Sequence, residues 1–167
     1  MFEKINYDRT SALNYAKKWA FKRNPDYFNF DDLGGDCTNF VSQCIFSGCK
    51  VMNYTKDFGW YYINVNNRAP AWTASKYLYN FLTQNKNAGP FAKDTSVENI
   101  EPGDIIQLGN KENQYYHSLF VVKIYDKDIF VAAHSVDSYM RPLKDYLFEN
   151  IRFLHILGAN KVKTNRK

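Results

Sequence analysis

The chain has 167 residues, of which 45% are hydrophobic and 17% aromatic, a composition that predicts one folded domain and excludes a disordered chain. Its formal charge of +5 is modest and dispersed, so we expect no nucleic-acid partner. No apolar run approaches the roughly 18 to 20 residues that a transmembrane helix needs, and the polar first residues do not resemble a signal peptide. We therefore expect a protein that is cytoplasmic as made, or exported without a Sec signal.

The first half of the chain has the apolar spacing of helices. Helices are predicted at 10–22, at 37–48 and at 71–86, where Gly and Pro residues mark their ends. The segment 53–70 is rich in Tyr, Trp and Asn and is too long for a simple connection, a length typical of functional loops.

The second half has the alternation and the β-branched residues of strands. Helices followed by antiparallel strands predict an α+β fold. Beyond residue 158 the chain becomes basic, which predicts a tail or the start of a linker after a domain at 1–158. The predicted strands cover residues 104–108, 118–125, 129–135 and 151–157.

Cys37 is the most informative residue, because it follows Gly34-Gly35 and opens a predicted helix. Asp36 is a natural N-cap residue for that helix. A thiol at a helix N-terminus meets unpaired N–H groups and the positive end of the helix dipole, which favour the thiolate. The chain has three cysteines and no CxxC spacing, so we expect neither a disulfide framework nor a zinc knuckle.

Five motifs, in this order, resemble the putative amidase domain family, a bacterial branch related to the NlpC/P60 and CHAP cysteine peptidases. The resemblance covers about residues 8 to 158. It implies a papain-like, NlpC/P60-type fold, with N-terminal helices packed on an antiparallel sheet, and cleavage of amide bonds. The motifs are Gly-Asp-Cys-Thr-Asn-Phe-Val-Ser-Gln at 35–43, Pro-Ala-Trp-Thr at 70–73, Gly-Asp-Ile-Ile-Gln at 103–107, His-Ser at 117–118 and Ala-His-Ser-Val-Asp at 133–137.

Carried over to this chain, the family pattern makes Cys37 the nucleophile and His117 the general base. His134 takes the third position, which orients the base, and Asp137 is the alternative for that role. A hairpin between 118–125 and 129–135 should bring the two histidines together. We expect Cys37 and His117 to form a thiolate–imidazolium pair.

Three further residues are candidates for substrate binding. Asp36 either caps its helix or holds the free amine of a peptide. Trp60 and Trp72 either line a groove or belong to the core. We expect no cofactor and no metal, because Asp31 and Asp32 form only an incomplete version of the calcium pattern of some CHAP domains.

The resemblance implies a hydrolase of bacterial peptidoglycan, either an N-acetylmuramoyl-L-alanine amidase or a stem-peptide endopeptidase. A basic surface favours approach to such an anionic polymer. An acyltransferase and a non-catalytic wall-binding module are the alternatives. Two settings stay open. One is a phage-type endolysin with a C-terminal wall-binding domain outside this chain, and the other is a host enzyme. We expect a monomer.

Overall fold

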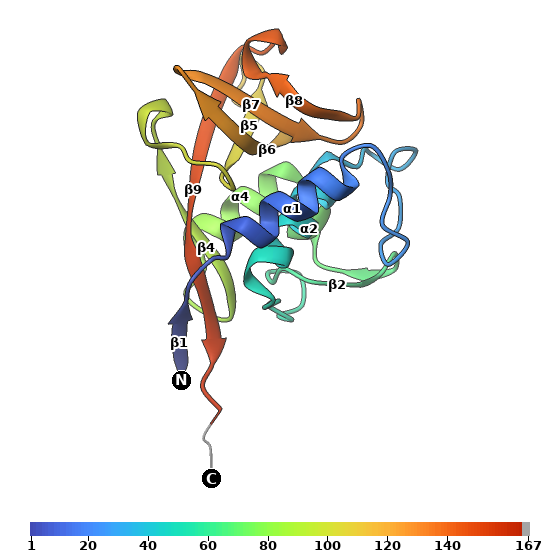
Figure 1. Ribbon diagram of the computed structural model, residues 1–167. Helices are drawn as coiled ribbons and strands as arrows, with labels where there is room; N and C mark the ends of the chain where they lie inside the picture. Colours follow the sequence, from blue (N-terminus) through green and yellow to red (C-terminus); the bar gives the residue numbers. More distant parts are fainter. Residues whose placement is uncertain (165–167) are drawn as a thin grey trace.

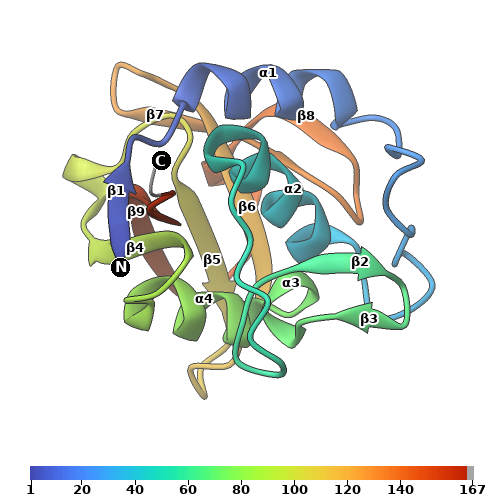
Figure 2. The same ribbon diagram turned by 90° about the horizontal axis from the view of Figure 1, so that it is seen from below.

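Helices gather on one face of an antiparallel sheet in the computed structural model, which describes residues 1–164 (Figures 1 and 2). This arrangement confirms the predicted α+β fold. Among the described residues, no helix has the length and apolar character needed to cross a membrane. The α-helices are α1 (Arg9–Trp19), α2 (Cys37–Cys49), α3 (Pro70–Thr73) and α4 (Ser75–Gln84), and short 3-10 turns lie at Val97–Asn99 and Leu143–Asp145.

The main sheet has seven strands, in the order β1-β9-β5-β6-β7-β8, and β4 also pairs with β9. Strands β2 (Tyr62–Asn64) and β3 (Asn67–Arg68) form a separate ribbon beside α3 (Figure 2). The strands of the main sheet are β1 (Phe2–Ile5), β4 (Gly89–Thr95), β5 (Ile105–Gly109), β6 (Tyr115–Tyr125), β7 (Asp128–Ala133), β8 (Ser138–Pro142) and β9 (Asn150–Val162).

The central helix α2 is buried almost all round, and its buried polar residues, such as Asn39 and Ser42, form hydrogen bonds inside the protein. Eleven of its residues are buried, and it packs on the sheet near β6. Its N-cap position is Asp36, and its last turn ends at Lys50, which has φ of +56°. The N-terminus of this helix therefore reaches the sheet at the start of β6.

Strand β6 separates two apolar cores, because successive side chains of a strand point to opposite faces. Phe120 belongs to the core between the helices and the sheet, while Leu119 and Val121 belong to a second core on the other face. Phe120 pairs with Ala132 of β7 in the antiparallel hairpin. The predicted hairpin is confirmed, and its register decides which side chains can meet.

The C-terminal strand is longer than the sequence suggested. β9 continues to Val162, where it pairs with Phe2, and Ala159 is fully buried. The predicted basic tail therefore starts inside a strand rather than after the fold. Its last residues, 165–167, lie outside the described residues.

Candidate active site

Cys37 is the first residue of α2, and its thiol packs against the start of β6. Gly34 and Gly35 have φ of +88° and +99°, which side-chain-bearing residues rarely adopt, so the chain turns sharply into the helix. The Cys37 Sγ lies 3.8 Å from Thr38 Oγ1 and 4.0 Å from the carbonyl oxygen of Tyr116. The side chain is 9% exposed. The predicted cysteine at a helix start is confirmed.

The surroundings of this thiol favour its protonated form. Burial raises the pKa of Cys37, and the carboxylate of Asp36 raises it further. Hydrogen bonds from Ser118 and Thr38 lower this pKa but do not outweigh burial. This corrects the expected thiolate–imidazolium pair, because the helix terminus does not offset the removal of the sulfur from water.

His117 lies in β6 between Tyr116 and Ser118, the two residues whose main chain contacts the Cys37 sulfur. Burial lowers the pKa of His117 to about 4, and the charge of Arg141 adds to this. Within residues 1–164, neither ring nitrogen has a hydrogen-bond partner. The imidazole is therefore neutral at pH 7 and keeps a nitrogen lone pair that can accept a proton.

His134 is 1% exposed and lies beneath the start of α2, stacked on the ring of Phe40 with a centroid separation of 4.1 Å. Its Nδ1 lies 2.5 Å from Asp36 Oδ2, and its Nε2 lies 2.9 Å from the carbonyl oxygen of Trp19. Both partners are hydrogen-bond acceptors, so a ring nitrogen that carries a hydrogen has an acceptor at either position. Both nitrogens are engaged in these contacts, so neither is available to orient His117.

The register of the hairpin explains this correction. Because Phe120 pairs with Ala132, position 118 rather than 117 comes opposite position 134. Ser118 faces the helices, where its Oγ lies 3.1 Å from Thr38, and the neighbouring His117 points to the other face of the strand. The hairpin brings the main chains of the two histidines close together, but their rings point in different directions.

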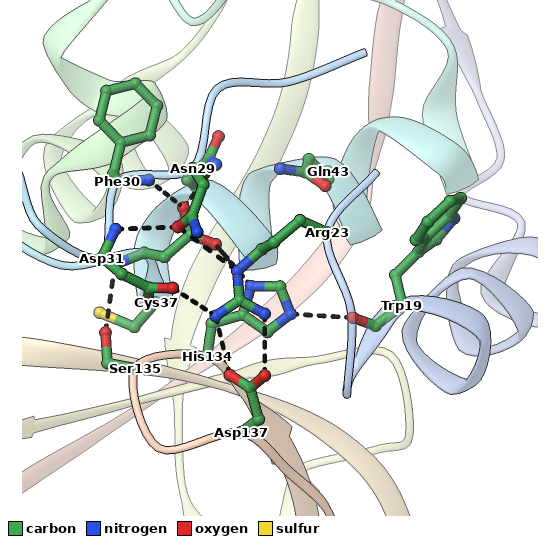
Figure 3. A network of polar contacts seen from close by, with 12 residues as sticks. Trp19, Arg23, Asn29, Phe30, Asp31, Cys37, Gln43, His134, Ser135 and Asp137 are labelled. Carbon is green, nitrogen blue, oxygen red and sulfur yellow. Dashed lines mark hydrogen bonds and ion pairs between the residues drawn. The ribbon is translucent and has the colours of Figure 1, made fainter. Parts of the chain in front are cut away.

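Arg23 gathers the carboxylates around this histidine (Figure 3). Its Nη1 and Nη2 each lie 2.9 Å from an oxygen of Asp137, and its Nη2 lies 2.8 Å from Asp31. Its Nε lies 3.4 Å from Asp36 Oδ2. We call these four residues and His134 the ionic network. Asp137, the alternative orienting residue, is held by this network and not by the candidate base.

The sequence matches one family over residues 6–156, nearly the whole chain, and that family is described as a putative amidase domain. The chain belongs to this family. It is 32% identical to the uncharacterized protein YhbB of Bacillus subtilis (strain 168) over 82% of the chain and 44% of the relative. It is 26% identical to the uncharacterized protein YjcM of the same strain, over 78% of the chain and 31% of the relative.

The chain thus spans less than half the length of these two relatives. No solved structure matches it. The sequence therefore shows membership of the putative amidase domain family, and the arrangement of the candidate site comes from the structure.

Asp36 of this amidase domain differs from both of its predicted roles. Its side chain makes no capping hydrogen bond to α2. Instead its carboxylate accepts from the Phe30 N–H and the Asn39 side chain, each at 2.9 Å, and contacts His134. These bonds lower the pKa of Asp36 although burial raises it. The carboxylate is fully buried, so it cannot receive the amine of a substrate in this conformation.

Trp60 and Trp72 belong to the core and do not line a groove. Both are fully buried, and their ring centroids lie 4.7 Å apart. The indole N–H of Trp60 donates to Ser42 Oγ at 3.0 Å, and that of Trp72 donates to Asn39 Oδ1 at 2.9 Å. This corrects their predicted role in substrate binding, because a buried indole needs a partner for its N–H and these rings find it on α2.

One group of ligating side chains, Glu101, Asp104 and His155, lies away from Cys37. Arg9 occupies this group, with its Nη1 2.8 Å from Asp104 Oδ1, and His155 Nδ1 lies 2.8 Å from Asp104 Oδ2. The positive charge of Arg9 already pairs with the buried Asp104 carboxylate, and it would repel a metal cation bound there. The group ties α1 to the sheet.

Sequence reasoning missed a buried set of neutral polar residues beside Cys37. It contains Thr38, Ser118 and Gln107, each at most 1% exposed, together with Ser75. The first three lie within the motifs that carry the family resemblance, although the pattern assigned them no role. The available signal was that Thr38 follows Cys37 and Ser118 follows His117 in the sequence, and that Gln107 ends a third motif.

Proposed function

We propose that this amidase domain is a cysteine-dependent amide hydrolase in which Cys37 is the nucleophile and His117 the general base. The observation that carries the proposal is the contact of the Cys37 sulfur with the main chain of Tyr116 and Ser118, on either side of His117. A thiol at a helix start and a neutral imidazole in the adjoining strand are the two groups that such a reaction needs.

The resting protonation states define the first step. The His117 ring makes no hydrogen bond to Cys37 in the described structure, so in the proposed step it accepts the thiol proton through one water as the sulfur attacks the carbonyl carbon of the substrate. The ion pair forms during attack. The C–N bond then breaks, the imidazolium gives its proton to the leaving amine, and an acyl-enzyme remains. Water, deprotonated by the same imidazole, releases the acid and restores the thiol. N–H groups at the start of α2 are suited to the oxyanion.

The proposed substrate is bacterial peptidoglycan, cut at the glycan–peptide amide or within the stem peptide. The resemblance to NlpC/P60 and CHAP peptidases supports this substrate and a papain-like fold. The net charge of +5 favours approach to an anionic wall polymer.

Mass spectrometry of fragments released from purified peptidoglycan tests the proposal. We expect peptide fragments with the wild type and none with Cys37→Ser. The matched control is Cys49→Ser, because Cys49 is also buried on α2 and donates to the Val51 carbonyl at 3.5 Å, a bond that serine can keep. Wild-type release by Cys37→Ser would refute the cysteine mechanism. Transfer to an added amine instead of water would indicate an acyltransferase.

The base is tested in the same assay. His117→Ala should reduce fragment release by about 10²- to 10⁴-fold, the usual contribution of a positioned general base. His134→Gln should act mainly through stability, because the ring of His134 contacts Asp36 and Trp19 rather than the reacting groups. A folded His117→Ala variant with undiminished activity would remove this residue from the mechanism.

A further inference from the structure

A guanidinium on β9 fixes the orientation of a buried amide on β5, the strand that pairs with β6. Arg152 of β9 donates to Gln107 Oε1 of β5 through its Nε at 2.9 Å and its Nη2 at 2.6 Å. Arginine has only donors, so the oxygen of the amide must face it. The Gln107 Nε2 then points inward and donates to Ser118 Oγ at 3.1 Å and to the Ser75 carbonyl at 2.9 Å.

The Gln107 amide donates to one of three buried hydroxyl groups that lie within hydrogen-bond distance of one another. Ser118 Oγ lies 2.8 Å from Ser75 Oγ and 3.1 Å from Thr38 Oγ1, and Ser75 Oγ lies 2.9 Å from Thr38 Oγ1. Because the Ser118 hydroxyl oxygen accepts a hydrogen bond from Gln107, its O–H can donate a hydrogen bond to Thr38 or to Ser75. Both routes allow Thr38 to donate onward, and its Oγ1 lies 3.8 Å from the Cys37 sulfur.

We infer that Arg152, Gln107, Ser118 and Thr38 form a hydrogen-bond relay that directs a hydroxyl hydrogen at the Cys37 sulfur and stabilises its thiolate during attack. The inference deepens the proposed function and rests on Cys37 being the nucleophile. Thr38 contacts the sulfur, and the other three are positioning residues that act through it. Linked hydrogen bonds polarise one another in a low-dielectric interior, so the charge of Arg152 strengthens the last donor.

The relay is rigid at its charged end and neutral inside. The guanidinium carbon of Arg152 lies 3.6 Å from the Tyr79 ring centroid and 3.8 Å from that of Tyr115, which holds the planar fork between two aromatic faces. Two carboxyl groups lie near the two ends of the relay. Asp94 accepts from the Tyr79 hydroxyl at 2.7 Å, and Asp36 stands beside Cys37. The charge of Asp36 opposes formation of the Cys37 thiolate, and a hydrogen-bond donor at the sulfur counteracts this effect.

Gln107→Glu tests the relay with a side chain of nearly the same size, and it also replaces the donor to the Ser75 carbonyl oxygen with an acceptor. The new carboxylate still accepts from Arg152 but replaces the inward donor with an acceptor, so Ser118 must donate outward and the relay reverses. The measurement is the rate of iodoacetamide alkylation of Cys37 between pH 6 and 10, followed by peptide mass. We expect the apparent thiol pKa to rise by about one unit, which is about tenfold slower alkylation near neutral pH.

Gln43→Glu is the matched control. Gln43 is buried on α2 itself, and its Oε1 accepts from the Tyr15 hydroxyl, a bond that a carboxylate keeps. The control adds the same buried charge on the helix that carries Cys37, without touching the relay. An equal shift in both variants would mean that added charge, not the direction of hydrogen bonds, controls the thiol, and would overturn the inference.

Thr38→Val and Thr38→Ser test the final donor. Valine has the shape of threonine without the hydroxyl and should slow alkylation as Gln107→Glu does, whereas serine should restore most of the rate. Unchanged profiles in both Thr38→Val and Gln107→Glu would refute the relay. Alkylation needs no hydrolysis, so this result is separate from the proposed function: shifted profiles with no activity on any wall substrate would refute the hydrolase and leave the relay in place.

Discussion

The ionic network contains Asp36, which precedes Cys37, and the relay contains Thr38, which follows it; the first is built from charged groups and the second mainly from neutral ones. The ionic network reaches Cys37 through the preceding residue, Asp36, and pairs charges between three separate segments of chain. The relay reaches it through the following residue, Thr38, and contains neutral groups until it meets Arg152. The first network joins loops to the helix start, and the second joins strands to it.

This difference indicates that the stability of the fold and the reactivity of the Cys37 thiol depend on different groups. Breaking a buried ion pair by removing one partner lowers the free energy of unfolding by several kcal/mol, because the other partner stays buried without a contact. The ionic network should therefore fix the position of the segment that carries Cys37. Neutral hydroxyl groups contribute less to stability but set the direction of hydrogen atoms at the sulfur. We therefore expect substitutions in the ionic network to affect mainly unfolding, and those in the relay to affect mainly the thiol.

The largest effect on stability is expected from Asp36→Ala. It removes the partner of His134 and two further acceptor bonds, and should lower the free energy of unfolding by about 3 to 5 kcal/mol in urea at pH 7. The pKa of Asp36 is lowered in the folded state, so its contribution is complete above the unfolded value near pH 4 and is lost as the pH falls through the lower folded value.

The difference between Asp36→Ala and wild type should therefore shrink below about pH 4. The control is Asp26→Ala, an exposed aspartate in the same loop, which should leave stability nearly unchanged. Equal losses for the two variants would show that the buried carboxylate does not hold this segment.

His117 provides a second, separate pH window. Its folded pKa of about 4 lies below the ordinary value of about 6.5, so the unfolded chain binds the extra proton between these values. Wild-type stability should fall by up to about 3 kcal/mol as the pH drops from 6.5 to 4 from this group alone. His117→Phe should flatten that slope in urea unfolding at several pH values, and parallel slopes would contradict the burial of a neutral ring.

Ser118→Ala should have a smaller effect, because the relay is neutral at this point. Gln107 keeps its bond to the Ser75 carbonyl, and Thr38 keeps Ser75, so the expected loss is about 1 to 2 kcal/mol. The loss should not change between pH 5 and 8. Ser47→Ala, which removes one half-buried bond to the Ser11 carbonyl, is the comparison. A loss as large as that of Asp36→Ala would mean that the relay, too, is chiefly structural.

The sequence predicted those parts of the fold that local pattern controls. The apolar spacing around Cys37 predicted α2, and alternation predicted the β6–β7 hairpin. Strand β4 was missed because its Gly-Pro start resembles a helix break. It becomes a strand only by pairing with β9, where the paired residues are 58 (Thr95 and Phe153) to 71 (Gly89 and Asn160) positions apart. β1 and β8 are short strands at the two ends of the sheet order and carry equally little local signal.

For the candidate site, the sequence predicted which residues take part but not the directions in which their side chains point. Motif order predicted Cys37 and His117 as site residues, and the structure places the Cys37 sulfur against the main chain on either side of His117. The partners of His134 depend on the register of two strands, and a bulge between Val121 and Lys123 changes that register within the hairpin. Trp60 could not be assigned to core or groove, because aromatic residues at that spacing fit either.

The smallest effect is expected from Asp137→Asn, at the solvent edge of the ionic network. The side chains of Arg23 and Asp137 are 23% and 30% exposed, so water and salt screen their pairing, and Arg23 keeps Asp31. We expect a loss of about 0.2 to 1 kcal/mol at low salt, or roughly 1 to 4 °C in Tm. At 1 M NaCl the difference should largely vanish, because the screening length falls to about 3 Å. Alkylation of Cys37 should follow the wild-type pH profile, since the variant leaves the relay intact. A shifted profile would show that the two networks act on the sulfur together, and the division between stability and reactivity would fail.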